Sequence, residues 1–403
     1  MHLQKGGRMK PLDGIRIVDL SRILAGPYCS MLLGDMGAEI IKIESPDHGD
    51  DTRGWGPPFI DGESAYFLSI NRNKKSLTLN LKAGQGKDIL TRLIGLSDVL
   101  IENFRPGTLG RLGFGYEQVR AMNPRMVYAS ISGFGQTGPL AGRPGYDLIA
   151  QGEGGIMSVT GFPDGPPTKA GTPIADIAAG IFAAQGILLA LYARERTGRG
   201  QLVDVSMLDG QVALLTFQAG IYFATGESPG RMGNQHPTIV PYETFRSKDG
   251  YINLAIGNTN LWRTFCKAIA REELSADPRF GTEASRVENR NALKPIMDAI
   301  VAERTTRQWL ELLERAGVPA GSVNSVAEIC EHPQIKAREM VVDVPHPTLG
   351  SVKVSGVPIK LSDTPGAVST APPLLGQHTA EILKGLLGYS LKEVEELRKA
   401  GVV

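Results

Sequence analysis

The sequence has few of the residues that build disulfide frameworks or metal centres. Only 3 cysteines occur among its 403 residues, and Cys29, Cys266 and Cys330 lie far apart without a CxxC pair. This spacing argues against a disulfide scaffold or a zinc knuckle, and it fits a reducing compartment. The 6 histidines are scattered, and none belongs to an HExxH motif. We therefore expect no metal site.

The chain also lacks an excess of charge of either sign. Its 43 basic and 42 acidic residues give a formal net charge of +1, so no bulk field attracts nucleic acid or a membrane surface. No uninterrupted run reaches the roughly 18 apolar residues of a membrane span. The basic leader over residues 1–10 lacks the apolar core of a secretion signal. We expect a cytoplasmic protein, with the mitochondrial matrix as the alternative, and no nucleic-acid or membrane partner.

What the sequence does contain is an alternation of strand and helix patterns. Ile15–Leu20 and Glu39–Glu44 are typical of buried strands, and a helix is predicted between them over Pro27–Met36. This order favours a parallel sheet with right-handed crossovers. Gly26 and Pro27 make the turn after the first strand tight, and ligands of open α/β sheets bind at that end of the strands.

Further strands and helices continue the pattern. Strands are predicted over Ser76–Leu81, Asp98–Glu102, Met126–Ile131 and Gln201–Ser206, with helices over Gly86–Leu96 and Met207–Thr225. The loop after the second of these strands places Asn103, Arg105 and Arg111 on the same rim, where Arg suits phosphate oxygens. A basic cluster of Arg72, Lys74 and Lys75 precedes the first of them, and it favours a solvated turn, with a phosphate contact as the alternative.

One glycine motif resembles a dinucleotide fingerprint only in spacing. GFGQTG spans residues 133–138, but Pro139, Gly142, Pro144 and Gly145 follow it. A fingerprint requires a helix to open inside the motif, and these residues prevent one. No GxxxxGK loop occurs either. We therefore expect no nucleotide cofactor and no ATP-driven chemistry.

The longest helix signal carries a single acidic residue that the helix does not need. Thr172 can cap the helix, Pro173 suits its first position, and Gly198 can end it. The segment between them is apolar almost all round, which predicts burial. Asp176 is the exception. It is either a first-turn carboxylate that the helix dipole stabilises, or an ionised nucleophile or base at the mouth of a buried site.

The composition changes after this helical region. A polar linker rich in Pro and Gly follows residue 225, which suggests a domain boundary. Hairpins are predicted over Thr244–Ile256 and Val341–Val354, with mostly helical sequence between them and helices near residues 378–386 and 391–399.

Seven stretches together resemble the class III CoA-transferases. They are LSRILAGPYCSMLLGDMGAEIIKIESPDHGDDTRGWGPPF (20–59), NRNKKSLTLNLK (71–82), ENFRPGTLGRLGFGYE (102–117), GFGQTGPLAGRPGYD (133–147), AGTPIADIAAG (170–180), GNQHPTIVPYETF (233–245) and PPLLGQHTAEIL (372–383). The resemblance covers nearly the whole chain. Within the family the sequence is most similar to the branch that transfers CoA from succinyl-CoA to short dicarboxylic acids such as glutarate.

The resemblance implies a fold and an assembly that periodicity does not show. A large Rossmann-like α/β domain would be built from residues 10–225 and the C-terminal return, 341–403. Residues 226–340 would form a smaller α+β domain with its linkers. Two subunits would be threaded through each other as an interlocked homodimer.

The resemblance also implies roles for single residues. Asp176 matches the family's nucleophile. The CoA positions fall on Ile23, Leu24, Ala25, Leu79, Asn103, Phe104, Arg111, Leu112, Arg143, Tyr146 and Asp147. A glycine loop over the active carboxylate corresponds to the segment around Gly257 and Asn258. Leu24 replaces the glutamine of the formyl-CoA:oxalate branch, which argues against oxalate, and Tyr146 replaces the histidine of related racemases.

The implied chemistry is an exchange of activated acyl bonds on Asp176, with acyl-CoA as a substrate and no metal. A second carboxylate on the substrate needs a cation, for which Arg22, Arg53, Arg143 and His236 are the candidates. Three alternatives stay open: a CoA-dependent racemase, a nicotinamide dehydrogenase and a CoA-binding protein without catalysis.

Overall fold

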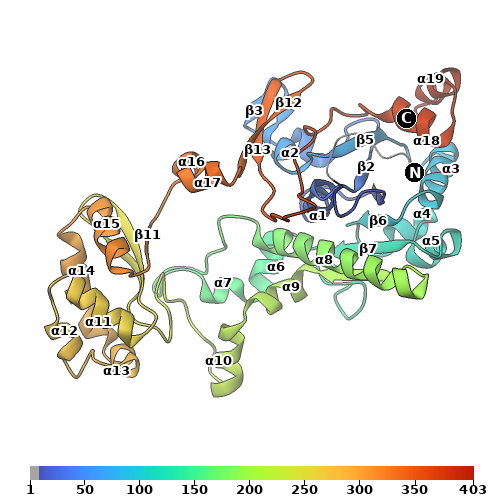
Figure 1. Cartoon of the computed structure of the whole chain (residues 1–403). Coiled ribbons are helices and arrows are strands. Elements are labelled where there is room, and N and C mark those ends of the chain that lie inside the picture. The colour runs from blue at the N-terminus through green and yellow to red at the C-terminus, as the bar shows by residue number, and fades with distance from the viewer. Residues whose placement is uncertain (1–8) are drawn as a thin grey trace. The chain divides into compact units, whose positions relative to one another are not determined.

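The computed structural model describes residues 9–403, which form two compact units (Figure 1). The first unit comprises the chain up to Ile156, Ala170–Thr216 and Pro333–Val403. The second comprises Met157–Lys169 and Phe217–His332, so it takes in a short segment that the expected boundaries assign to the large domain. Most of the basic leader lies outside the described residues, and the cytoplasmic location stays a prediction.

A six-stranded parallel sheet forms the centre of the first unit. Its strands are β1 (Arg16–Asp19), β2 (Glu39–Glu44), β5 (Lys74–Thr78), β6 (Val99–Glu102), β7 (Val127–Ser132) and β8 (Leu202–Ser206). They lie in the order β5-β2-β1-β6-β7-β8, which is the order of the doubly wound dinucleotide-binding folds. The predicted α/β class with a large parallel sheet is confirmed. The direction of winding changes between β1 and β6.

Helices cover both faces of this sheet. On one face α1 (Ala25–Asp35) and α8 (Ile174–Thr197) pack on Ile17, Val99 and Val127. On the other face lie α3 (Gly84–Gly95), α5 (Tyr116–Met122), α18 (Thr379–Leu387) and α19 (Leu391–Lys399). Figure 1 shows the last two, in red, beside α3. The C-terminal segment therefore completes the core that the N-terminal segment begins.

Of the remaining short elements, α10 (Phe217–Thr225) and α16 (Val326–Glu331) belong to the second unit, and α7 (Ile156–Val159) begins at the last residue of the first unit's N-terminal segment. The others belong to the first unit. They are η1 (Asp51–Gly54), β3 (Phe59–Ile60), β4 (Glu63–Ser64), α2 (Ala65–Ile70), α4 (Thr108–Leu112), α6 (Asp147–Glu153), α9 (Met207–Leu214), α17 (Pro333–Ala337), β12 (Val341–His346) and β13 (Gly350–Ser355). The last two strands pair as the predicted hairpin.

The second unit has an antiparallel sheet of three strands covered by helices. The strands are β9 (Tyr242–Arg246), β10 (Tyr251–Ala255) and β11 (Ala320–Ser322), and the first two form the predicted hairpin. The helices are α11 (Thr259–Ala268), α12 (Glu273–Ala276), α13 (Glu283–Glu288), α14 (Arg290–Ala302) and α15 (Thr306–Ala316). Trp262, Phe265 and Trp309 are fully buried in this core.

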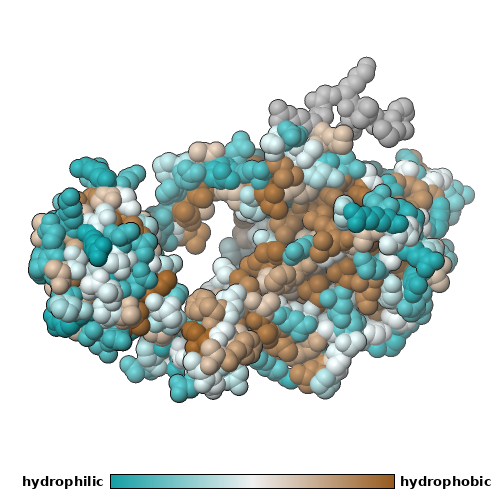
Figure 2. Space-filling model, turned by 60° about the horizontal axis from the view of Figure 1, so that its bottom comes forward, coloured by the Kyte–Doolittle hydropathy of each residue, from teal (hydrophilic) through white to brown (hydrophobic). Residues whose placement is uncertain are grey.

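The helix α8 differs from its prediction at its start and on one face. It begins at Ile174 with Pro173 as its N-cap, and no side chain caps it. The Gly198 cap has the expected left-handed conformation, with φ of 69°. Leu188, Leu189 and Tyr192 are exposed, so the prediction of complete burial is wrong. Figure 2 turns this side forward and shows apolar, brown surface on it.

By length and composition, α8 is also the one helix in residues 9–403 that could cross a membrane. Core helices of soluble proteins pass the same test, so the expectation of no membrane partner is not tested by it and stays a prediction. Half of the most apolar window of α8 is buried inside the protein, as expected of a helix that packs on a sheet.

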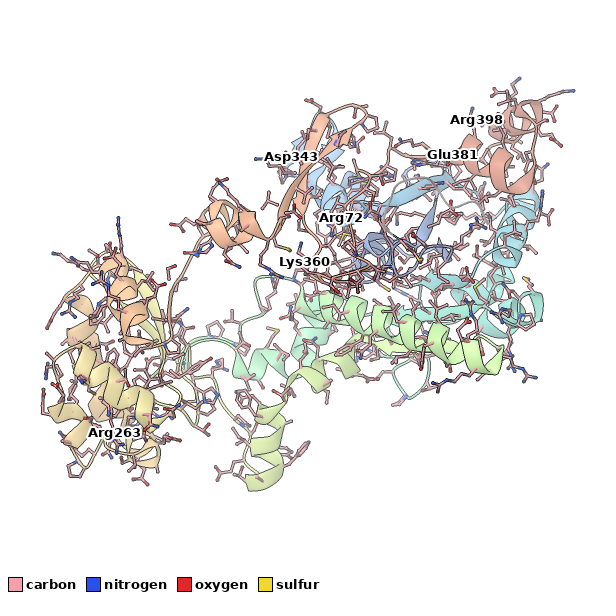
Figure 3. The ribbon with its side chains drawn as sticks, viewed as in Figure 1. Arg72, Arg263, Asp343, Lys360, Glu381 and Arg398 are labelled. Atoms are coloured by element: carbon pink, nitrogen blue, oxygen red, sulfur yellow. The ribbon has the colours of Figure 1, made fainter. Side chains whose placement is uncertain are left out.

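Two further predictions of local structure are wrong. The helix predicted over Met207–Thr225 is broken between α9 and α10, where Thr216 has a left-handed φ of 43°. The basic cluster is neither a solvated turn nor a free phosphate contact. The guanidinium of Arg72 binds both carboxylate oxygens of Asp35, and the buried Lys74 donates to the carbonyl of Pro27. Lys75 pairs with Glu39 and with Glu381 of α18 (Figure 3).

Candidate active site

The turn that follows β1 is tight because a glycine lets two segments approach. A Cβ atom on Gly26 would lie 2.2 Å from Cβ of Ser21, so no other residue fits there without displacement. Asn103, which follows β6, fixes the turn from the other side. Its side-chain oxygen accepts from the N–H of Arg22 at 2.8 Å, and its amide donates to the Arg22 carbonyl at 2.6 Å. The loops after β1 and β6 are thereby joined where the sheet changes its direction of winding.

A pocket of about 300 Å³ opens beside this junction. It lies at the carboxyl ends of β1, β6 and β7, the place where open α/β sheets bind their ligands. It is lined by Arg22, Ile23, Leu24, Ala25, Asn103, Phe104, Arg105, Pro106, Thr108, Ile131, Ser132, Gly133, Arg143, Pro144, Gly145, Tyr146, Asp176 and Met207. We call it the Asp176 pocket.

A second pocket of about 460 Å³ lies at the carboxyl ends of β1, β2 and β5. Its lining shares Arg22, Phe104 and Thr108 with the Asp176 pocket, so the two are adjacent. Lys82 and Arg111 supply cations to it. We call it the Arg111 pocket. Together the two pockets offer a continuous place for a long ligand that carries phosphates at one end.

Asp176 stands in the first turn of α8 without a partner. Among residues 9–403, no hydrogen bond or ion pair holds its carboxylate. The first-turn N–H of Ala175 is bound instead by Asp147, whose Oδ1 accepts at 2.9 Å. Burial, together with the negative charge of Asp147, raises the pKa of Asp176 to about 7. A helix N-terminus alone would lower that pKa. The choice between a dipole-stabilised carboxylate and a nucleophile stays a prediction.

The expected CoA positions gather at the two pockets. Ile23, Leu24, Ala25, Asn103, Phe104, Arg143 and Tyr146 line the Asp176 pocket, while Leu79, Phe104, Arg111 and Leu112 line the Arg111 pocket. Asp147 lies outside the lining of both. It accepts hydrogen bonds from Ala175 and Gln151, and so fixes the start of α8.

The four candidate cations occupy different environments. Arg22 and Arg143 line the Asp176 pocket and are partly exposed, with ion pairs to Asp51 and Glu153. Arg53 is engaged by both carboxylate oxygens of Glu44 and stacks on the ring of Phe67. These contacts indicate that Arg53 stabilises the fold.

The other candidates, His236, Gly257 and Asn258, belong to the second unit. The imidazole of His236 stacks on Phe217 and meets Tyr242 edge-on. The side chain of Asn258 accepts from Leu261 N–H and caps α11. The roles expected of these three residues stay predictions.

The sequence-based analysis missed one acidic residue at the strand ends. Glu102 ends β6 and is buried; its carboxylate accepts from the hydroxyl of Ser130 and from the Phe104 N–H. Burial raises the pKa of Glu102 to about 7. Glu102 could have been predicted as a site residue because it directly precedes Asn103 at the end of a predicted strand. In residues 9–403 no group of three or more His, Cys, Asp or Glu side chains could hold a metal ion.

Comparison with known proteins agrees with this geometry. CoA-transferase family III matches residues 12–379. The chain is 44% identical to the succinyl-CoA:glutarate CoA-transferase of Mus musculus, over 98% of this chain and 91% of that protein. It is also 44% identical to the acetyl-CoA:oxalate CoA-transferase of Acetobacter aceti, over 92% and 94% of the two chains.

A solved structure shares the whole fold. A CAIB/BAIF family protein from Brucella suis matches with a TM-score of 0.85 and 43% identity, over 94% of this chain and 100% of that chain. The family match and these relatives span nearly the full length, including both pockets and Asp176. The chain therefore belongs to CoA-transferase family III, whose members use CoA thioesters as substrates, and it is a CoA-transferase.

Proposed function

We propose that the protein moves CoA from succinyl-CoA to a short dicarboxylic acid such as glutarate, with Asp176 as the covalent carrier. The observation that carries the proposal is the unpartnered carboxylate of Asp176 in a pocket at the switch point of the sheet. The choice of acids is supported by the relative named succinyl-CoA:glutarate CoA-transferase.

The reaction would proceed through two kinds of intermediate. An oxygen of ionised Asp176 attacks the thioester carbonyl. CoA leaves as its thiolate, and the acyl group and Asp176 form a mixed anhydride. The thiolate then attacks the Asp176 carbonyl carbon, which releases the donor acid and leaves an aspartyl-CoA thioester. The acceptor carboxylate attacks this thioester and expels the thiolate again. The thiolate finally attacks the acceptor's acyl carbonyl, which frees Asp176 and the new acyl-CoA.

The pockets suit the two ends of acyl-CoA. The Arg111 pocket has cations for phosphate oxygens, and the Asp176 pocket would receive the thioester. Positioning of this kind supplies up to about 7–11 kcal/mol in favourable cases. Leu24 and Ala25 stand at the start of α1, where N–H groups are free to face an oxyanion; each such donor is worth roughly 3–4 kcal/mol.

A screen of acceptor acids tests the function. With succinyl-CoA as donor, we expect glutarate to be used at least about tenfold better than butyrate, because only a diacid can place a second carboxylate on a pocket cation. Oxalate belongs in the same screen, since one relative is named for it. Formation of each acyl-CoA is measured by liquid chromatography and mass spectrometry. Equal rates with butyrate would overturn the dicarboxylate assignment and leave the CoA-transferase class unaffected.

Two variants would identify the cation in the same assay. Arg143→Gln and Arg22→Gln each remove a positive charge from the Asp176 pocket. The variant that lacks the binding cation should raise KM for glutarate while KM for butyrate stays the same. A variant that raises both values alike has instead lost a contact with CoA.

We also propose that the protein is an obligate interlocked dimer. Exposed apolar side chains on α8 and α9, among them Leu189, Tyr192 and Val212, support a partner on this surface. Subunits threaded through each other cannot separate without unfolding, so dilution to nanomolar concentration should yield no folded monomer. Sedimentation that shows a compact species of 43.2 kDa would contradict the interlocked arrangement.

A further inference from the structure

A buried ion pair lies behind the turn that follows β1. Nζ of Lys42, on β2, is 2.8 Å from Oδ2 of Asp50, and both side chains are 0% exposed. Burying two charges costs desolvation free energy that their attraction often only balances. Fold stability alone is therefore a weak reason for this pair. Both residues lie in the floor of the Arg111 pocket, yet neither side chain is exposed to it.

The pair binds the backbone of the turn directly. Nζ of Lys42 donates to the carbonyl of Ser21 at 2.9 Å. Oδ1 of Asp50 accepts from the N–H of Ile23 at 3.2 Å, and it is itself oriented by the N–H and hydroxyl of Thr52. The pair therefore holds the turn from the β2 side, while Asn103 holds Arg22 from the β6 side.

Ile23 has a backbone conformation that its side chain disfavours. Its φ is 71°, in the left-handed region where a β-branched residue is a true outlier. Such strain persists only where surrounding contacts impose it, and it concentrates at ligand sites. The next two residues, Leu24 and Ala25, line the pocket that holds Asp176. Their positions depend on the dihedral angles of Ile23.

We propose that Lys42 and Asp50 are positioning residues that hold Ile23 in its left-handed conformation and so shape the acyl-CoA pocket beside Asp176, without contacting substrate. The inference rests on the proposed function in taking this pocket as the acyl-CoA site. Without the pair, the turn relaxes toward the conformation that Ile23 prefers, and Leu24 and Ala25 leave the pocket wall.

A comparison in two backgrounds tests the proposal. Lys42→Met with Asp50→Leu replaces the pair by apolar groups of similar size and leaves no unpaired charge. In the protein with Ile23, we expect KM for acyl-CoA to rise roughly tenfold or more. In the Ile23→Gly background the same double substitution should change KM by less than about threefold, because glycine adopts a left-handed φ without strain.

A second ion pair provides the matched control. Arg72, which Figure 3 labels, and Asp35 are equally buried, with side chains 1% and 0% exposed. Neither residue is in the lining of either pocket. Arg72→Met with Asp35→Leu should leave KM for acyl-CoA within about twofold, whatever its effect on the melting temperature. A shift in KM as large as that of the first pair would mean that any lost buried pair disturbs the pocket, and it would overturn the proposal.

The readouts separate this proposal from the proposed function. The dissociation constant of CoA is measured by calorimetry and requires no turnover. It reports the shape of the CoA-binding pocket even if the acid substrates are assigned wrongly. An equal fold-change of KM in both backgrounds would indicate direct contact with CoA or general loosening, and would overturn the role of Ile23. If the double variant does not fold, Asp50→Asn, which keeps the shape and one acceptor oxygen, is compared in the same two backgrounds. A larger fold-change of KM with Ile23 than with Ile23→Gly would again support the proposal, and an equal fold-change would overturn it.

Discussion

Replacing Asp176 by Asn should abolish CoA transfer and leave the fold and CoA binding intact. The side chain is unpartnered in the described part of the chain, so an amide of the same shape removes no hydrogen bond. It also removes the repulsion between this carboxylate and Asp147. What is lost is the anionic oxygen that attacks the thioester. We expect kcat to fall by roughly 10³-fold or more, as when a nucleophile is removed and only binding and oxyanion contacts remain.

Trapping the carrier tests the same role without a variant. Incubation with acyl-CoA in the absence of an acceptor acid should charge Asp176, because the anhydride and thioester both form before the acceptor enters. Hydroxylamine should then convert the activated carboxyl into a hydroxamate. Peptide mass spectrometry would place this group on the fragment that contains Asp176.

The matched control is another aspartate in the first turn of a helix. Asp209 lies in the first turn of α9 and is exposed. Asp209→Asn should cost only about 0.3–1 kcal/mol of stability and no turnover. If freshly prepared Asp176→Asn, free of deamidation, behaves like this control and keeps more than about a tenth of its activity, Asp176 is a helix-terminus carboxylate. The covalent mechanism would then fail.

Much of the sheet could be predicted because its signals are local. Buried runs such as Ile15–Leu20 and Glu39–Glu44 identify strands, and a helix between them implies parallel pairing. The carboxyl ends of parallel strands share one edge, so Asn103, Arg105 and Arg111 were expected on the rim where the turn after β1 also lies. The structure adds that Asn103 contacts Arg22 there. The dinucleotide reading of residues 133–138 is excluded by a local signal too, and no helix begins between residue 133 and Asp147.

Partners far apart in sequence could not be predicted. Arg72 and Lys74 look like a solvated cluster because Asp35 and the Pro27 carbonyl, which bind them, lie dozens of residues away. Lys42 and Asp50 are only 8 residues apart, but their pair was missed because no periodic pattern indicates that the loop brings Asp50 back to β2. An apolar pattern likewise cannot distinguish a buried face from an exposed one, as on α8.

The rate should fall steeply as pH drops below neutrality, because the nucleophile must be ionised. Burial and the charge of Asp147 raise the pKa of Asp176 to about 7, whereas a solvated aspartate would be fully ionised well below that pH. Protonation removes the attacking anion. Below the pKa, kcat/KM for acyl-CoA should therefore fall about tenfold for each pH unit, since this ratio reports ionisation in the free enzyme. Activity at pH 5 should be near one-hundredth of its plateau above pH 8.

Asp147→Asn tests whether the charge of Asp147 contributes to the raised pKa of Asp176. It removes the like charge while its oxygen can still accept from the Ala175 N–H. The carboxylate of Asp176 is then easier to ionise, so the midpoint of the profile should move to lower pH. It should stay above the usual range for aspartate, because burial is the larger cause of the shift. The control is Glu117→Gln, which removes an exposed carboxylate from α5 and should leave the midpoint unchanged. A profile that is flat between pH 5 and 8, or a midpoint that Asp147→Asn raises, would show that the ionisation of Asp176 does not limit the reaction.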